Sequence, residues 1–527
     1  MDEKVKKKKG KSKLKIIIII LLIVIVAVVG FYIYNKKNKG TNNSITNDKT
    51  EVSSAYRMSG NGIENFDLSF LKLENKETNL LYSPLSIKYA LAMLSTGANG
   101  NSKAQIDAII GDYSSKKYIN SNNMSFANAM FIKDSFKDNV KKDYTDKLSS
   151  RYDASVIYDS FKTPDKINSF VSEKTFGLIN KLFDRDISSN NFFLVNALAI
   201  DMEWNKWLQA TSQSDYKDFY NVSYNHEKYN DYIDPIMGER YQTLKFNNNS
   251  INAKAVQIGA SINNYDIIKE LGEENIRKTI KSEYQSFIDE DSCGIRTNPD
   301  ANKDDLDVDK FTDKFISELK ENYKRVDSST DFMLYTDDKV KAFAKDLKTY
   351  NGTTLQYVGI MPKTDDLASY VKNLDSSDIS GIIKNLKEIK AENFTEGKVT
   401  KITGYIPLFK FDYQLQLKKD LKELGVLDVF DEKKADLSNM ITGTSNYIDS
   451  ADHKANIEFS NEGIKAAAVT VEGGFGSTGC GFEHLYDVPV EEINITFDKP
   501  YLFLIRDKDT GEVWFVGTVY EPITNVE

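Results

Sequence analysis

The first strong pattern in the chain is an uninterrupted apolar run, Ile16 to Tyr34, which follows a segment with eight lysines. Nineteen helical residues reach about 28 Å, enough to cross a bilayer. Only three lysines follow the run closely, and no Ala-x-Ala cleavage site does, so we favour an uncleaved anchor over a cleaved signal peptide. We expect a cytoplasmic basic segment at 1–15, a transmembrane helix at 16–34, and a polar tether at 35–55 outside the cell.

From Tyr56 onward the chain mixes helical and strand periods, as a globular domain does. Apolar residues at helical spacing predict helices after Ser83-Pro84, at 167–175, at 276–287, and at 308–319 behind a cap at Asp307. Strands are predicted at 126–132, 192–200, 355–362, 400–411, 454–459, 493–497, 501–505 and 513–519. Helices dominate early and strands late, which favours an α+β domain.

One polar residue interrupts the most apolar strand. Asn196 stands in the middle of 192–200, a run that is apolar on both faces and typical of a strand in the centre of a covered sheet. A buried amide needs partners for its donors and its acceptor, so we expect hydroxyls or a histidine beside it.

The stretch from His453 to His484 has no single structural preference. It begins as an alternating strand, is broken by Gly463, and continues through three alanines into Val469-Thr470-Val471 and a glycine-rich part. Alanines favour helix, β-branched residues favour strand, and glycines hold neither. This segment is therefore expected to change its conformation.

Composition excludes several classes of function. A formal charge of −9 and a pI near 5.3 argue against nucleic-acid binding. The two cysteines, Cys293 and Cys480, are interpreted as free thiols rather than as a bridge. The three histidines lack metal-ligand spacing, and the acidic loop 300–309 lacks the glycine and the bidentate glutamate of a calcium loop. We expect no metal, no cofactor and no enzyme activity.

Several dispersed motifs now support one family. They are Asn79-Leu-Leu-Tyr-Ser-Pro-Leu-Ser86, Val195-Asn-Ala197 with Trp204, Pro407-Leu-Phe-Lys-Phe411, Leu424-Gly-Val426 with Phe430, Ala435-Asp-Leu-Ser438, His453-Lys-Ala455, Glu462-Gly463 with the alanines, and Asp498 to Arg506 through Phe515-Val-Gly517. In this order they resemble the serpin family, from about Tyr56 to Pro522. The resemblance implies three β-sheets with about eight or nine helices around a large central sheet, and an exposed, mobile reactive-centre loop.

The resemblance also implies roles for particular residues. Ser83, Ser86, Asn196 and His453 match the polar cluster beneath the central strands, which lets them part. The loop hinge matches Asn461, Glu462, Gly463, Ile464, Lys465, Ala466, Ala467, Ala468, Val469 and Thr470. In the family, a serine or cysteine protease cleaves the loop, which then inserts into the sheet and traps the acyl-enzyme.

The side chains of the hinge can be compared with what insertion into a sheet requires. Every second side chain of an inserted strand must enter the core, so Ile464, Ala466, Ala468 and Thr470 form the inward set. Small and apolar inward residues fit this requirement. Asn461 and Ile464 depart from the glutamate and the small hydroxyl residue that the family usually has, and Glu472 adds a carboxylate to the inward set.

The scissile bond follows from family spacing only. Fourteen residues beyond the hinge glycine the spacing gives Ser477-Thr478, but the loop is about eleven residues longer than is typical. If the extra length precedes the bond, cleavage moves toward Tyr486-Asp487-Val488.

A second departure is the excess of residues between Trp207 and Phe332. We assign a serpin domain to 56–527 with an extra helical insertion at about 208–331. This insertion is either an accessory subdomain for partner binding or a tolerated surface insertion.

These features predict a monomeric protease inhibitor, single-pass in the cell membrane with the serpin domain extracellular. The alternative is a non-inhibitory serpin-fold surface protein whose long loop is an interaction segment.

Overall fold

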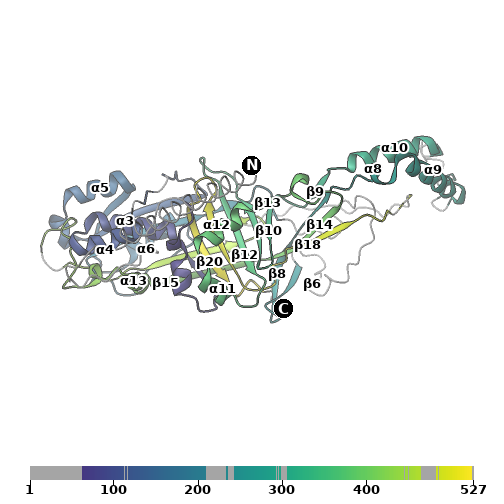
Figure 1. Cartoon of the computed structure of the whole chain (residues 1–527). Helices are drawn as coiled ribbons and strands as arrows, with labels where there is room; N and C mark the ends of the chain where they lie inside the picture. Colours follow the sequence, from purple (N-terminus) through teal and green to yellow (C-terminus); the bar gives the residue numbers. More distant parts are fainter. Residues whose placement is uncertain are drawn as a thin grey trace, which may run out of the picture. The chain divides into compact units, whose positions relative to one another are not determined.

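The structure, a computed structural model, describes residues 62–111, 113–114, 117–208, 233–234, 242–291, 294, 296–297, 306–443, 446–448, 450–464, 482, 484 and 486–524. The chain divides into two compact units, Met1–Glu51 and Val52–Glu527, and all described residues lie in the second (Figure 1). The predicted segments 1–15, 16–34 and 35–55 lie outside the described residues. Within the described part, no helix has both the length and the apolar character needed to cross a membrane.

Two smaller sheets hold the central strands of the chain. The first has the order β3-β2-β4 and the second the order β15-β16-β17-β5. Their strands are β2 (Met124–Lys133), β3 (Ala154–Asp159), β4 (Phe192–Ile200), β5 (Met202–Glu203), β15 (Phe409–Leu415), β16 (His453–Phe459) and β17 (Gly463–Ile464).

Two larger sheets complete the β-structure. The seven-stranded sheet has the order β1-β20-β19-β12-β11-β10-β13, and the six-stranded sheet has the order β18-β14-β8-β7-β6 with β9 paired to β8. Their strands are β1 (Leu80–Tyr82), β6 (Ile233–Asp234), β7 (Gln242–Phe246), β8 (Ile251–Asn263), β9 (Val326–Ser328), β10 (Met333–Thr336), β11 (Val340–Asp346), β12 (Leu355–Pro362), β13 (Lys387–Glu388), β14 (Val399–Pro407), β18 (Val490–Asn494), β19 (Tyr501–Asp507) and β20 (Val513–Val519).

The helices cover the sheets and form one group of their own. The α-helices are α2 (Ser69–Leu73), α3 (Pro84–Gly97), α4 (Gly100–Ile110), α5 (Lys142–Tyr152), α6 (Asp165–Lys174), α8 (Ile267–Leu271), α9 (Glu273–Glu290), α10 (Val308–Asn322), α11 (Leu367–Asn373), α12 (Ser376–Lys384) and α13 (Leu417–Glu423). Short 3-10 helices lie at Asn65–Leu68, Asp134–Asn139, Ala391–Asn393 and Asp428–Phe430. Helices α8, α9 and α10, here called the helical arm, lie together beyond strands β14 and β18 (Figure 1).

The α+β class is confirmed, whereas the predicted numbers of sheets and helices differ from the structure. The described residues form four paired sheets instead of three, because the strands expected in one central sheet fall into the groups of β4 and of β16. The described residues also hold more than eight or nine helices, since several consist of only one or two turns. Of the predicted insertion 208–331, strands β7 and β8 belong to the six-stranded sheet, so its helical part begins at Ile267.

One predicted strand is two strands. The apolar pattern over 400–411 gives a single run, but β14 ends at Pro407 and β15 begins at Phe409 in another sheet. Leu408, the residue after Pro407, still donates its N–H to the carbonyl of Lys254 on β8, so it remains hydrogen-bonded to the six-stranded sheet. The chain therefore changes sheets directly after Leu408, and Phe409 pairs with Phe459 of β16.

Candidate functional site

The site is an opening between two strands that share no hydrogen bonds with each other. Strand β4 pairs with β2 on one side, and β16 pairs with β15. Among the described residues, the facing edges of β4 and β16 are joined only at one end, where the two residues of β17 lie between β16 and β5. Along the rest of their length the two described edges are not paired with each other, so both present unpaired backbone groups.

A small cavity lies on each face of this opening. One has a volume of about 70 Å³ and is lined by α3, by Phe192, Leu194 and Asn196 of β4, and by His453 of β16. The other has a volume of about 40 Å³ and lies on the α6 side, lined by Phe193 and Val195 of β4. Phe192 lines only the first cavity and Phe193 and Val195 line only the second, whereas Leu194 and Asn196 line both. The space between β4 and β16 is therefore underpacked on both faces.

Three of the four predicted cluster residues meet at the start of α3. Ser83 caps this helix, because its Oγ accepts a hydrogen bond from the N–H of Ser86 at 3.1 Å. The N–H of Ser83 donates to Nε2 of His453 at 2.9 Å. The Ser86 hydroxyl is buried without a hydrogen-bond partner and lines the larger cavity. Burial lowers the pKa of His453 to about 4, so its imidazole is neutral.

The fourth residue, Asn196, has a partner that the sequence did not identify. Its Nδ2 donates to Oδ1 of Asn128 at 2.5 Å, directly across the β2–β4 ladder. Its own Oδ1 is buried with no partner and lies in the wall of the same cavity as His453. Asn128 also interrupts an apolar strand, and this shared pattern was the signal that could have found it.

The hinge lies at the end of the opening next to β5. The carbonyl of Glu462 accepts from the N–H of Trp204 at 2.9 Å, and that of Asn461 accepts from Leu208 at 2.7 Å. Gly463 pairs with Glu203, and Ile464 is only 1% exposed. A Cβ on Gly463 would collide with the carbonyl oxygen of Met202 and lie 2.7 Å from Cα of Glu203. Only glycine lets the chain pass this close to β5.

The other predicted loop residues lie outside the described residues. These are the hinge residues Lys465, Ala466, Ala467, Ala468, Val469 and Thr470 and the proposed bond Ser477-Thr478.

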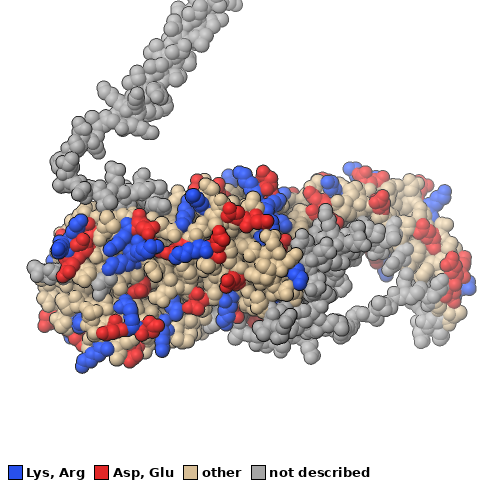
Figure 2. All heavy atoms as spheres, turned by 90° about the horizontal axis from the view of Figure 1, so that it is seen from below, with Lys and Arg blue, Asp and Glu red and all other residues tan. Residues whose placement is uncertain are grey.

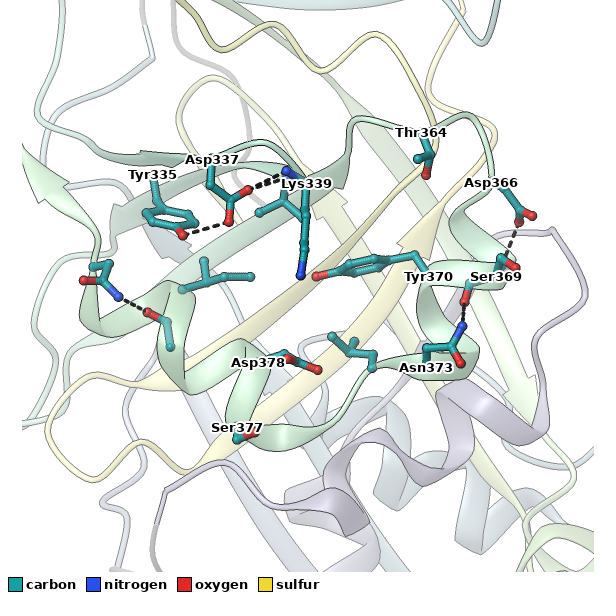
Figure 3. A pocket seen from close by; sticks show the side chains of 15 residues that line it. Tyr335, Asp337, Lys339, Thr364, Asp366, Ser369, Tyr370, Asn373, Ser377 and Asp378 are labelled. Atoms are coloured by element: carbon teal, nitrogen blue, oxygen red, sulfur yellow. Dashed lines mark hydrogen bonds between the residues drawn. The ribbon is translucent and has the colours of Figure 1, made fainter.

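A larger hollow lies elsewhere in the described part of the chain. It has a volume of about 740 Å³ and lies between β10, β11, α11 and α12, with Lys339 and Tyr370 pointing into it (Figure 3). Its carboxylates serve local structure: Asp337 accepts from two backbone N–H groups and from Tyr335, and Asp366 caps α11. Asp337 and Asp366 are therefore both engaged in local structural hydrogen bonds.

The surface carries mixed charge. Lysine and arginine alternate with aspartate and glutamate over the described atoms on the face in Figure 2, without a broad basic patch. The described residues also contain no group of three histidine, cysteine or acidic side chains suited to a metal ion.

The geometry defines a protein with a parted sheet and a loop that already occupies one end of the opening. A family model described as Serpin (serine protease inhibitor) matches residues 64–259 and 310–522. The chain belongs to the serpin family. The match omits 260–309, which contains α8 and α9 of the helical arm.

Relatives agree with this assignment. Leukocyte elastase inhibitor of Xenopus tropicalis is 25% identical over 489 residues, which cover 87% of this chain and 97% of that protein. The protein of the same name from Homo sapiens is 32% identical over 226 residues, 40% of this chain and 55% of its own length. The chain thus spans about half the length of the first curated relatives it matches.

Solved structures share the fold. The thermophilic serpin tengpin in its native state has a TM-score of 0.55 and 20% identity, covering 92% of this chain and 98% of that one. Thyroxine-binding globulin in complex with thyroxine has a TM-score of 0.54 and 16% identity, covering 88% and 98%. The description of the matching family model names serine protease inhibitors.

Proposed function

We propose that this chain is a suicide-substrate inhibitor of serine or cysteine proteases. A protease attacks the bond Ser477-Thr478 and forms an acyl-enzyme with the loop. The hinge residues 464–470 then insert between β4 and β16, and the attached protease is carried along and distorted. The chain supplies no catalytic group; it supplies a lower-energy state that only a cleaved loop can reach.

One observation carries the proposal: the unpaired edges of β4 and β16, with the hinge seated at one end of the gap. A strand that filled the gap would gain backbone hydrogen bonds on both sides, each with a net stabilisation of about 1 kcal/mol. It would also fill the cavities on both faces. Ile464 is already buried, so insertion would extend a strand that has begun.

Small residues at the bond suit proteases with a small specificity pocket. Two relatives carry the name leukocyte elastase inhibitor, which supports an elastase-like target. We further propose that residues 16–34 anchor the chain in the cell membrane with the inhibitor outside. Carbonate extraction of expressing cells should leave the full chain in the membrane pellet, whereas release into the supernatant would contradict the anchor.

The inhibitor proposal is tested by mixing the full chain, in detergent, with pancreatic elastase or subtilisin. Denaturing gels should show a complex of protease and inhibitor that survives SDS, and mass spectrometry should find the cut after Ser477. Simple cleavage without a stable complex, for every serine and cysteine protease tried, would favour the non-inhibitory alternative.

A matched pair of variants controls for the mechanism. Ala468→Glu places a carboxylate in the inward set, whereas Ala467→Glu places the same group in the outward set. Ala468→Glu should turn the inhibitor into a plain substrate, and Ala467→Glu should still form the complex. Equal trapping by the two variants would argue against strand insertion.

A further inference from the structure

The helical arm contacts the far end of the reactive loop through one phenylalanine. The ring of Phe482 stands edge-on to Tyr284 and Phe311, with centroids 5.2 and 5.5 Å away. It meets Phe287 and Phe315 in the same way at 5.8 and 6.3 Å. Edge-to-face packing of this kind is the favourable geometry for aromatic rings. Phe482 therefore sits in a site built by four rings from α9 and α10.

Polar and apolar contacts continue after Phe482. The Nδ1 of His484 lies 2.6 Å from Oε2 of Glu283 on α9. Tyr486 and Val488 are 8% and 5% exposed and belong to one buried cluster with Ile276, Ile280 and Ile316 of the arm. The core of the arm is thus completed by side chains of the loop.

The arm itself is a braced platform. Tyr284 of α9 stacks on Phe311 of α10 with centroids 3.5 Å apart. Lys281 pairs with Asp309, Arg277 with Asp313, and Lys320 with Glu273, so three ion pairs join the two helices. A surface held in this way presents the aromatic site in a fixed position.

Two departures from the family meet at this contact. Residues 260–309 fall outside the family match, and the serpin resemblance of the sequence leads us to expect a loop that is longer than usual. The insertion and the longer loop pack against each other, so one role, the binding of the loop by the insertion, would explain both. If the extra loop length lies on the arm, it lies after the bond and not before it.

We propose that the helical arm is a clamp for the loop residues after the scissile bond, namely Phe482, His484 and Tyr486–Val488. It keeps Tyr486-Asp487 from the extended conformation that a protease active site requires, and it makes Phe482 and His484 positioning residues for cleavage at Ser477-Thr478. Only this last consequence rests on the proposed function.

Hydrogen exchange of the full chain in detergent tests the clamp without any protease. In the wild type, amides of 482–490 should exchange slowly. Phe311→Ala, which leaves the loop sequence unchanged, should accelerate them about tenfold or more. Leu271→Ala is the control, since Leu271 is an exposed side chain of the same arm, and it should change nothing. Fast exchange of this segment in the wild type would overturn the proposal.

A charge exchange separates docking from folding of the arm. Glu283→Lys and His484→Glu should each speed exchange of 482–490 about two- to fivefold, because each removes the contact or sets like charges together. The double variant forms a new Lys–Glu pair and should return to near the wild-type rate. If the amides of α9 also exchange faster in Phe311→Ala, the charge variants decide the question. A double variant whose exchange of 482–490 stays fast would contradict the clamp.

The consequence for cleavage has a separate readout. With pancreatic elastase, chymotrypsin or subtilisin, cuts in the wild type should fall before Phe482, and Phe311→Ala should add cuts at Tyr486-Asp487. Where a protease is trapped, the unclamped variant should trap a smaller fraction of it. If no protease is trapped, the proposed function is wrong, and the hydrogen-exchange rates still decide whether the clamp exists. If proteases are trapped but the variants all exchange their amides at the wild-type rate, only the clamp is wrong.

Discussion

Gly463 sits where no side chain fits. Its backbone runs against Met202 and Glu203, so a methyl group would force the hinge away from β5. Overpacking of this kind costs about 1–3 kcal/mol. Gly463→Ala should therefore lower the free energy of unfolding by that amount in urea titrations.

Gly381 offers the matched control. It lies inside α12, and a Cβ there would meet nothing within 4 Å. Gly381→Ala should be neutral or stabilise by about 0.5–1 kcal/mol, because alanine loses less backbone entropy in a helix. If the two variants unfolded alike, the hinge would not be seated against β5 as described.

His453 predicts how stability depends on pH. Its pKa is lowered from 6.5 to about 4 by burial, so between these values the unfolded chain binds a proton that the folded chain does not. The stability due to the neutral imidazole is complete above about pH 6.5 and is lost as pH falls toward 4, by about 3 kcal/mol in total. Acid should thus weaken the contact between β16 and α3.

The measurement compares wild type with His453→Gln from pH 7.5 to 4. The glutamine oxygen can still accept from Ser83 but does not titrate. The wild type should lose about 3 kcal/mol relative to the variant over this range. Burial raises the pKa of Asp420 to about 6, so its contribution to stability changes with pH in the opposite direction. Asp420 is present in both proteins, so its contribution cancels in the comparison. Parallel pH profiles would refute the assignment.

At the scale of elements, local patterns predicted strands and helices well. The run 192–200 is β4 with the same ends, and the helix after Asp307 is capped by that side chain. The amphipathic patterns of 276–287 and 308–319 are α9 and α10. Each of these rests on the periodicity of neighbouring residues, which the sequence displays directly.

Relations between distant segments were less accessible. The partner of Asn196 is Asn128, sixty-eight positions away, and only the ladder between β2 and β4 brings them together. The opening between β4 and β16 exists because these two strands do not pair with each other. No local residue pattern indicates that a pairing is missing. Likewise the sequence predicted an apolar face on each arm helix but not that Phe482 would lie against both.

At the scale of the whole molecule, the open gap implies that the uncleaved chain is not in its most stable arrangement. A strand of about seven residues between β4 and β16 would add hydrogen bonds on two edges, or roughly 5–10 kcal/mol. Stabilisation of this size raises a thermal midpoint by about 5–10 °C in a chain of this length. Cleavage of the loop should therefore make the molecule more heat-resistant although it breaks a peptide bond.

Differential scanning calorimetry before and after a cut at Ser477-Thr478 measures this rise. Ile464 is buried, so the inward set continues through Ala466, Ala468 and Thr470. Cleaved Ala468→Glu should keep the low midpoint of the intact chain, because its carboxylate would have to enter the core without a partner. Cleaved Ala467→Glu should rise like the wild type. If the midpoint rises in both cleaved variants, the stabilisation comes from elsewhere in the fold. If it rises in neither variant and not in the cleaved wild type, the gap does not accept the loop.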